Sequence, residues 1–107
     1  MPPHDFDVPL DDAALEWIRY RFTTQGADVT VFTVQYETTI DGERVPVVRY
    51  DTAHGFAHRD RMNRQGEEIR KETVGEGLSL KEALNLGEQD IKANWPRYRE
   101  EFFRGTP

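Results

Sequence analysis

Seven residues near the C-terminus repeat at steps of three and four, and this stripe constrains the fold more than any other feature. They are Leu80, Leu84, Gly87, Ile91, Trp95, Tyr98 and Phe102. Such spacing aligns side chains along one face of an α-helix, here over about six turns. A helix with one apolar stripe must bury it against another element. The rest of the chain therefore has to supply an apolar surface of similar length.

Local signals predict where this helix begins and where it bends. Ser79 followed by Glu82 matches the capping-box pattern of a helix N-terminus. Pro96 removes one hydrogen bond inside the helix and predicts a break or a kink near Asn94. Because the stripe keeps its phase across the proline, we predict one kinked helix.

The chain before the helix is rich in β-branched and aromatic residues that alternate with polar ones, which predicts strands. We expect five of them, at residues 17–24, 29–40, 45–51, 56–63 and 67–74. Residues 13–22 also admit a short helix capped by Asp11 or Asp12, but a strand there lets residues 25–28 form a turn. The expected fold is α+β, an antiparallel meander sheet of about five strands with the long C-terminal helix packed on one face.

The N-terminal segment differs in composition from the rest of the chain. Residues 1–11 hold three prolines and three aspartates, which predicts a flexible acidic arm ahead of a single α+β domain at residues 12–107. Residues 1–16 carry five acids and no lysine or arginine. Two interpretations of this arm remain open: it covers a basic face of the sheet transiently, an effect that salt would screen, or it is an ordinary solubilising tail, which we favour.

Composition excludes several classes of protein. The absence of cysteine rules out a disulfide framework and a thiolate metal site. No apolar run approaches the roughly 20 residues of a membrane span, and no signal-peptide pattern opens the chain, so a cytoplasmic protein without a cofactor is expected. The net charge of −6 argues against strong nonspecific nucleic-acid binding but leaves room for a local basic face.

Strand alternation divides the side chains between two faces of the expected sheet. The face that the helix would cover carries Ile18, Tyr20, Phe22, Phe32, Val34, Tyr36, Ile40, Val48 and Tyr50. The opposite face would be rich in arginine, with Arg19, Arg21, Arg49 and, in one choice of register, Arg59 and Arg61.

The fourth expected strand is ambiguous, because placing Phe56 and Met62 in the core also turns His58 and Asp60 inward. Either His58 lies in a partly buried polar pocket near the end of the sheet, or a bulge changes the register.

Two histidines fall in the stretch Val47–Arg61 together with arginines and aspartates, and three interpretations of this cluster remain open. His54 and His58 could act as acid and base in cleaving an RNA phosphodiester, with Arg49, Arg59 or Arg61 stabilising the phosphorane. The two histidines could instead ligate a metal together with Asp51 or Asp60. They could also be ordinary hydrogen-bonded residues of a turn and a strand. Residue types alone favour the structural interpretation most and the metal site least.

The stretch Arg49-Tyr-Asp-Thr-Ala-His-Gly-Phe-Ala-His-Arg-Asp60, with a helix ending Asn94-Trp95-Pro-Arg-Tyr98, resembles small proteins related to the TumE-type toxins of toxin–antitoxin pairs. The resemblance covers roughly residues 17–104, and its specific part is this one motif. It carries over the motif positions Asp51, His54, His58 and Arg59. Asp60 departs from the pattern, since many relatives have a further histidine after the arginine.

Two functions from different classes follow from these observations. The resemblance implies a toxin-like component of a toxin–antitoxin pair. The histidine chemistry described above would make it a metal-independent RNA-cleaving protein, with His54, His58, Arg59 and Asp51 as its catalytic residues. Its partners would be a cognate antitoxin protein and RNA, with a homodimer also open and no membrane involved. The alternative is a non-enzymatic module that contacts a protein or nucleic acid through Arg19, Arg21, Arg49 and Arg61.

Overall fold

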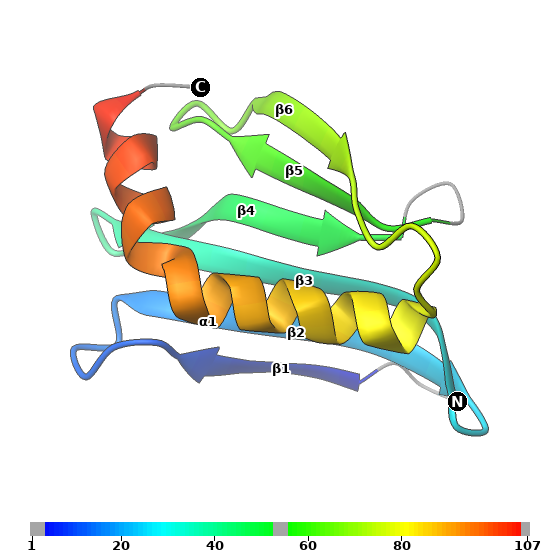
Figure 1. Ribbon diagram of the computed structural model, residues 1–107. Helices are drawn as coiled ribbons and strands as arrows, with labels where there is room; N and C mark the ends of the chain where they lie inside the picture. The colour runs from blue at the N-terminus through cyan, green and yellow to red at the C-terminus, as the bar shows by residue number, and fades with distance from the viewer. Residues whose placement is uncertain (1–3, 53–55, 106–107) are drawn as a thin grey trace.

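An open antiparallel sheet with one long helix on one face forms the protein. The computed structural model describes residues 4–52 and 56–105. The strands lie side by side in chain order (Figure 1): β1 (His4–Pro9), β2 (Glu16–Gln25), β3 (Asp28–Ile40), β4 (Glu43–Asp51), β5 (His58–Met62) and β6 (Glu68–Thr73). Helix α1 (Leu80–Arg104) packs across the sheet. The predicted α+β meander with a C-terminal helix is confirmed, with six strands in the sheet.

Residues 13–22, where a helix and a strand competed, belong mainly to strand β2. The favoured strand is therefore confirmed. Asp11, a candidate helix cap, instead closes the loop before β2, where its Oδ1 accepts the backbone N–H groups of Leu15 and Glu16 at 3.0 and 3.1 Å. In the hairpin that joins β3 to β4, Asp41 and Gly42 have φ of 51° and 82°. Positive φ at both central residues is what a tight hairpin between twisted strands requires.

The expectation of a flexible acidic arm is wrong for residues 4–9, which form the edge strand β1. This strand pairs with β2 from His4 opposite Phe22 to Pro9 opposite Trp17. Stacked rings support the backbone ladder, with the centroids of Phe6 and Tyr20 4.7 Å apart. The physical reason is that residues 4–9 are stabilised by contacts distant in sequence, which their own composition does not reveal. Strand β2 offers them backbone groups at its edge for hydrogen bonding and aromatic rings for stacking.

Helix α1 buries the predicted stripe against the sheet. Ser79 Oγ accepts the N–H of Glu82, and the Glu82 carboxylate accepts the N–H of Ser79, so the capping box is confirmed. Pro96 lies inside the helix, and Figure 1 shows α1 bending partway along, so that its last turns run toward β5 and β6. The predicted kink without a break is therefore confirmed.

The core lies between α1 and strands β2 to β4. Its buried residues include Ile18, Tyr20, Phe32, Val34, Tyr36, Val48 and Tyr50 from the sheet and Leu84, Ile91, Tyr98 and Phe102 from the helix. Phe22 and Ile40, expected in the same layer, are only partly buried. Gly87 lets α1 approach closely, because a Cβ added there would stand 2.8 Å from Cγ of Tyr50. No helix or strand among the described residues covers the opposite face of the sheet.

Candidate functional site

The sheet face opposite α1 carries two cross-strand rows of polar side chains. One row runs Asp7, Arg19, Gln35, Arg49, Asp60 and Lys71 from β1 to β6. The adjacent row runs Asp5, Arg21, Thr33, Asp51, His58 and Thr73. We call this the open face. The predicted placement of Arg19, Arg21 and Arg49 on it is confirmed.

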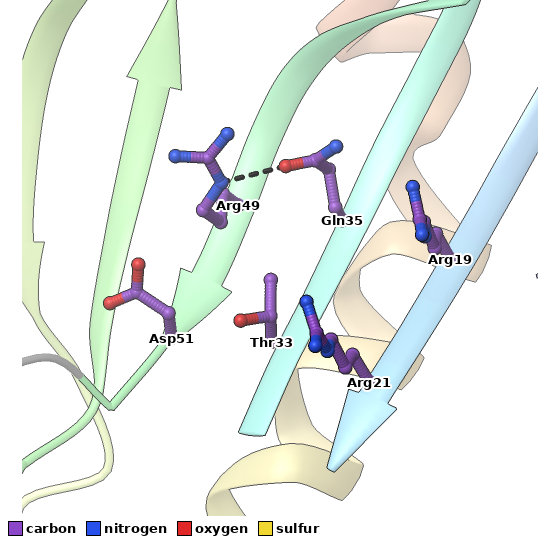
Figure 2. A pocket seen from close by; sticks show the side chains of 6 residues that line it. All are labelled: Arg19, Arg21, Thr33, Gln35, Arg49 and Asp51. Atoms are coloured by element: carbon purple, nitrogen blue, oxygen red, sulfur yellow. Dashed lines mark hydrogen bonds between the residues drawn. The ribbon is translucent and has the colours of Figure 1, made fainter. Parts of the chain in front are cut away.

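A shallow pocket of about 320 Å³ lies in the middle of the open face. It is lined by Arg19, Arg21, Thr33, Gln35, Arg49 and Asp51. Figure 2 shows Arg19 and Arg21 standing on β2, Thr33 and Gln35 on β3, and Arg49 and Asp51 on β4, with α1 behind the sheet. Three arginines against one aspartate make the pocket locally cationic in a chain of net charge −6.

Gln35 orients the guanidinium of Arg49. Its Oε1 accepts the Nε–H of Arg49 at 2.6 Å (Figure 2), and its amide nitrogen donates to Glu37 at 2.5 Å. Glu37 in turn accepts from Arg44 at 3.0 Å. Among residues 4–52 and 56–105, the terminal nitrogens of Arg49 make no hydrogen bond or ion pair. Gln35 thus fixes Arg49 through its Nε, while the two terminal nitrogens of the guanidinium stay available to a ligand.

The other two arginines of the pocket differ in how far they are neutralised. Arg19 donates to both oxygens of Asp5, at 3.3 and 3.2 Å. This hydrogen bonding lowers the pKa of Asp5 below its usual value. Arg21 is exposed and makes no hydrogen bond or ion pair with any described residue. Arg21 and Arg49 are therefore the uncommitted cations of the pocket.

His58 and Asp60 point to the open face but are almost inaccessible, at 5% and 3% exposure. His58 lies opposite Asp51, and its ring is tilted against that of Phe56, with ring centroids 4.5 Å apart. Asp60 lies between Arg49 and Lys71 on the neighbouring strands, and burial raises its pKa, helped by the charges of Glu68 and Asp51. His54, the second histidine of the catalytic hypothesis, lies outside the described residues.

Arg59 and Arg61 do not lie on the open face, so the register that placed them there is wrong. They pair with Tyr50 and Val48 and so face α1. Arg59 donates to the Tyr98 hydroxyl at 3.1 Å and to Glu72 at 2.8 Å. Arg61 binds Glu101 at 2.5 Å.

The side chains of β5 point to the faces opposite to those expected, because Arg59 pairs with Tyr50. Placing Phe56 in the core suggested the other parity, but Phe56 is 49% exposed. Arg59 therefore points away from His58 and Asp51, and the four proposed catalytic residues do not share one face.

Acidic residues of α1 anchor a polar network inside the helix–sheet layer. Asp90 Oδ2 accepts the hydroxyls of Tyr50 and Tyr98 at 2.5 and 2.6 Å. Glu88 accepts the hydroxyl of Tyr20. Residue type alone would place Glu88 and Asp90 on the solvent-exposed side of the helix, and the structure shows instead that both accept tyrosine hydroxyls of the sheet or the helix. The signal was present, because a buried tyrosine hydroxyl needs a polar partner.

A similar tyrosine–carboxylate pair stands on the other side of the core. Glu16 accepts the hydroxyl of Tyr36 and lies 3.4 Å from Arg99 of α1. Burial is the main cause that raises the pKa of Tyr36 and of Tyr50 above the ordinary value, and the neighbouring carboxylates add to it. These tyrosines therefore stay protonated as donors, which suits a structural role.

The metal interpretation receives no support from the part of the chain that the structure describes. No group of three or more histidine, aspartate or glutamate side chains is placed there to hold a metal ion. The described part also contains no helix that is both long and apolar enough to cross a membrane.

Comparison with protein families gives one result. A family model described as Domain of unknown function (DUF7718) matches residues 1–106. Neither the comparison with curated proteins nor that with solved structures gives a match. The resemblance to TumE-type toxins is not tested by this result and stays a prediction.

Proposed function

The chain belongs to the DUF7718 family of unknown function, and from that premise we propose that it is a non-enzymatic binding domain. It takes an anionic group of its partner in the pocket of the open face. Arg49 and Arg21 supply the main contacts, and Arg19 lies beside them. The binding residues are those of the module expected from the sequence, except that Arg61 is excluded because it faces α1.

One observation carries this proposal: the outer nitrogens of Arg49 and the guanidinium of Arg21 line the same pocket without partners among the described residues. A guanidinium is a planar fork that matches the oxygens of a carboxylate or a phosphate. Holding Arg49 by its Nε lowers the conformational entropy that binding would cost. Thr33 adds a hydroxyl donor on the strand between the two arginines.

The burial of His58 favours binding over catalysis. A general acid or base must come within hydrogen-bonding reach of the substrate, whereas His58 is 5% exposed. By contrast, Arg49 lines the pocket of the open face, where a partner can reach its guanidinium without a change in the fold.

The proposal predicts that anion binding weakens when either guanidinium group is removed from the pocket. Arg49→Gln and Arg21→Gln should each weaken binding of an anionic probe by about ten-fold or more, the usual worth of a hydrogen bond to a charged group. Titration calorimetry with inorganic phosphate, an acidic peptide and a short RNA measures this.

The matched control is Arg64→Gln, which removes the same charge from an exposed residue outside the pocket. It should leave the affinity within about two-fold, since surface charges away from a site contribute little. No binding of any of the three probes by the wild type, or equal losses in Arg49→Gln and Arg64→Gln, would overturn the proposal.

RNA cleavage by a toxin-like protein is the second candidate. The observation that favours it is that His58 lies on the open face opposite Asp51, one strand away from Arg49. Wild-type protein should then cleave labelled RNA in the presence of EDTA, and His58→Ala should abolish cleavage while keeping the circular dichroism of the fold. Intact RNA with the wild type, or unchanged cleavage by His58→Ala, contradicts this function.

A further inference from the structure

We propose that the group held in the pocket is a phosphate monoester, either of a small molecule or of a phosphorylated side chain, and not a polyanion. This inference rests on the proposed function and narrows it to one chemical class. Three features of the open face lead to it: the charge of the two arginines that lack partners among the described residues, the geometry of the donors, and the acidic rim of a small pocket.

The first feature is a match of charge. Arg19 is neutralised by both oxygens of Asp5, so Arg21 and Arg49 are left as the two uncommitted cations. A phosphate monoester carries a charge of about −1.5 to −2 at pH 7. Each of the two guanidinium groups can pair with one negative charge of a phosphate dianion, whereas a carboxylate or a sulfate ester supplies only one charge for both. Asp51 lines the same pocket and lowers its net positive charge without occupying either guanidinium among the described contacts.

The second feature is the geometry of the donors. Arg21, Thr33 and Asp51 form one cross-strand row, and Arg49 lies in the next row on the same strand as Asp51. The backbones of β2 and β4 are separated by two strand spacings, roughly 10 Å. Two long arginines from these strands can therefore reach one group held above Thr33. The terminal oxygens of a phosphate accept from both forks and from the hydroxyl.

The third feature is the acidic rim of this centre. Asp5 and Asp7 border the pocket on β1, Glu37 lies beyond Gln35, and Asp60 lies beside Arg49 on β5. A nucleic acid or an acidic peptide lying across the pocket would bring its neighbouring charges against these carboxylates, which is unfavourable. The pocket of about 320 Å³ is at the small end of ligand sites, which suits one compact group.

The experiment compares probes of equal shape and different charge. Phenyl phosphate and phenyl sulfate are titrated into the full chain by calorimetry, beside a phosphoserine peptide and a short RNA without terminal phosphates. Phenyl phosphate should bind about ten-fold tighter than phenyl sulfate, the effect of one further charge-assisted contact. Arg21→Gln and Arg49→Gln should each remove most of this preference, and the RNA should not compete.

Strand β1 offers a matched pair of variants for the charge argument. Asp5→Asn frees Arg19 in the pocket and should tighten phenyl phosphate binding by roughly two- to five-fold, the scale of an exposed ion pair. Asp7→Asn makes the same change on the same strand, but Asp7 binds Arg44, which does not line the pocket and keeps its ion pair with Glu37. Asp7 also borders the pocket, so its neutralisation should raise the affinity, but less than that of Asp5. An equal gain in both variants would mean that the overall electrostatic field, and not the release of Arg19, sets the affinity, and would contradict the assignment.

The outcomes separate this inference from the proposed function. If phenyl sulfate binds as tightly as phenyl phosphate, or if RNA binds through Arg21 and Arg49 while phenyl phosphate does not, the inference is wrong and the binding function stands. If no anion binds at all, both fall. Tighter binding of the phosphoserine peptide than of phenyl phosphate assigns the phosphate to a protein partner, and the reverse order assigns it to a small molecule.

Discussion

Asp90→Ala is expected to lower the free energy of unfolding by about 2–4 kcal/mol, because two buried hydroxyls lose their acceptor at once and each costs about 1–3 kcal/mol. Tyr50 and Tyr98 donate to the same oxygen of Asp90, and Asn94 donates to the other at 2.8 Å. The Asp90 side chain is 17% exposed, so water replaces part of the loss. Urea denaturation followed by circular dichroism measures the change.

Two variants make the Asp90 result specific. Asp90→Asn keeps one acceptor oxygen and should lose less stability than Asp90→Ala. Glu100→Ala removes an acid from the same helix at a side chain that is 67% exposed, and its effect should stay within about 0.5 kcal/mol. An equal effect of Asp90→Ala and Glu100→Ala would mean that the tyrosine–carboxylate network contributes nothing to stability.

The positions of Arg19, Arg21 and Arg49 could be predicted because their strands are long and alternate clearly. β2 and β3 have 10 and 13 residues, and aromatic or branched residues mark every second position facing the helix. In such strands a slip of one residue would expose the whole apolar set, so the register is strongly specified. The three arginines that line the pocket could therefore be assigned to the open face from the sequence.

The side of the sheet that Arg59 faces could not be predicted in the same way. β5 has five residues, and His58, Asp60 and Arg61 fit either face by residue type. Its parity is set by a non-local pairing, Arg59 opposite Tyr50. The carboxylates that accept from Arg59 and from the tyrosines lie on other elements, so no local pattern indicates which parity satisfies them.

The edge strand β1 was missed for a related reason. Prolines and aspartates predict disorder when they are counted, but the alternation of His4, Phe6 and Val8 with Asp5 and Asp7 is a strand pattern. The strand is held by partners on β2, through Phe6 on Tyr20 and Asp5 on Arg19. The acidic segment does meet the basic face, as a fixed strand that neutralises one arginine of the pocket.

Ile91→Ala is expected to lower the free energy of unfolding by roughly 2–5 kcal/mol. Ile91 is fully buried at 0% exposure and lies in one cluster with Val34, Tyr36 and Val48. The tyrosines around it are held by their carboxylates, so they cannot easily move to fill the space. A large part of the removed volume should therefore remain as a cavity, which places the loss in the upper half of that range.

The measurement is chemical denaturation with two controls on the same helix. Ile91→Val removes one carbon and should cost about 0.5–1.5 kcal/mol. Leu86→Ala truncates a leucine that is 39% exposed, and its loss should be well below that of Ile91→Ala because little area leaves water there. If Leu86→Ala and Ile91→Ala destabilise equally, α1 does not pack on the sheet through this face. The open face would then no longer be the uncovered side on which the proposed phosphate site depends.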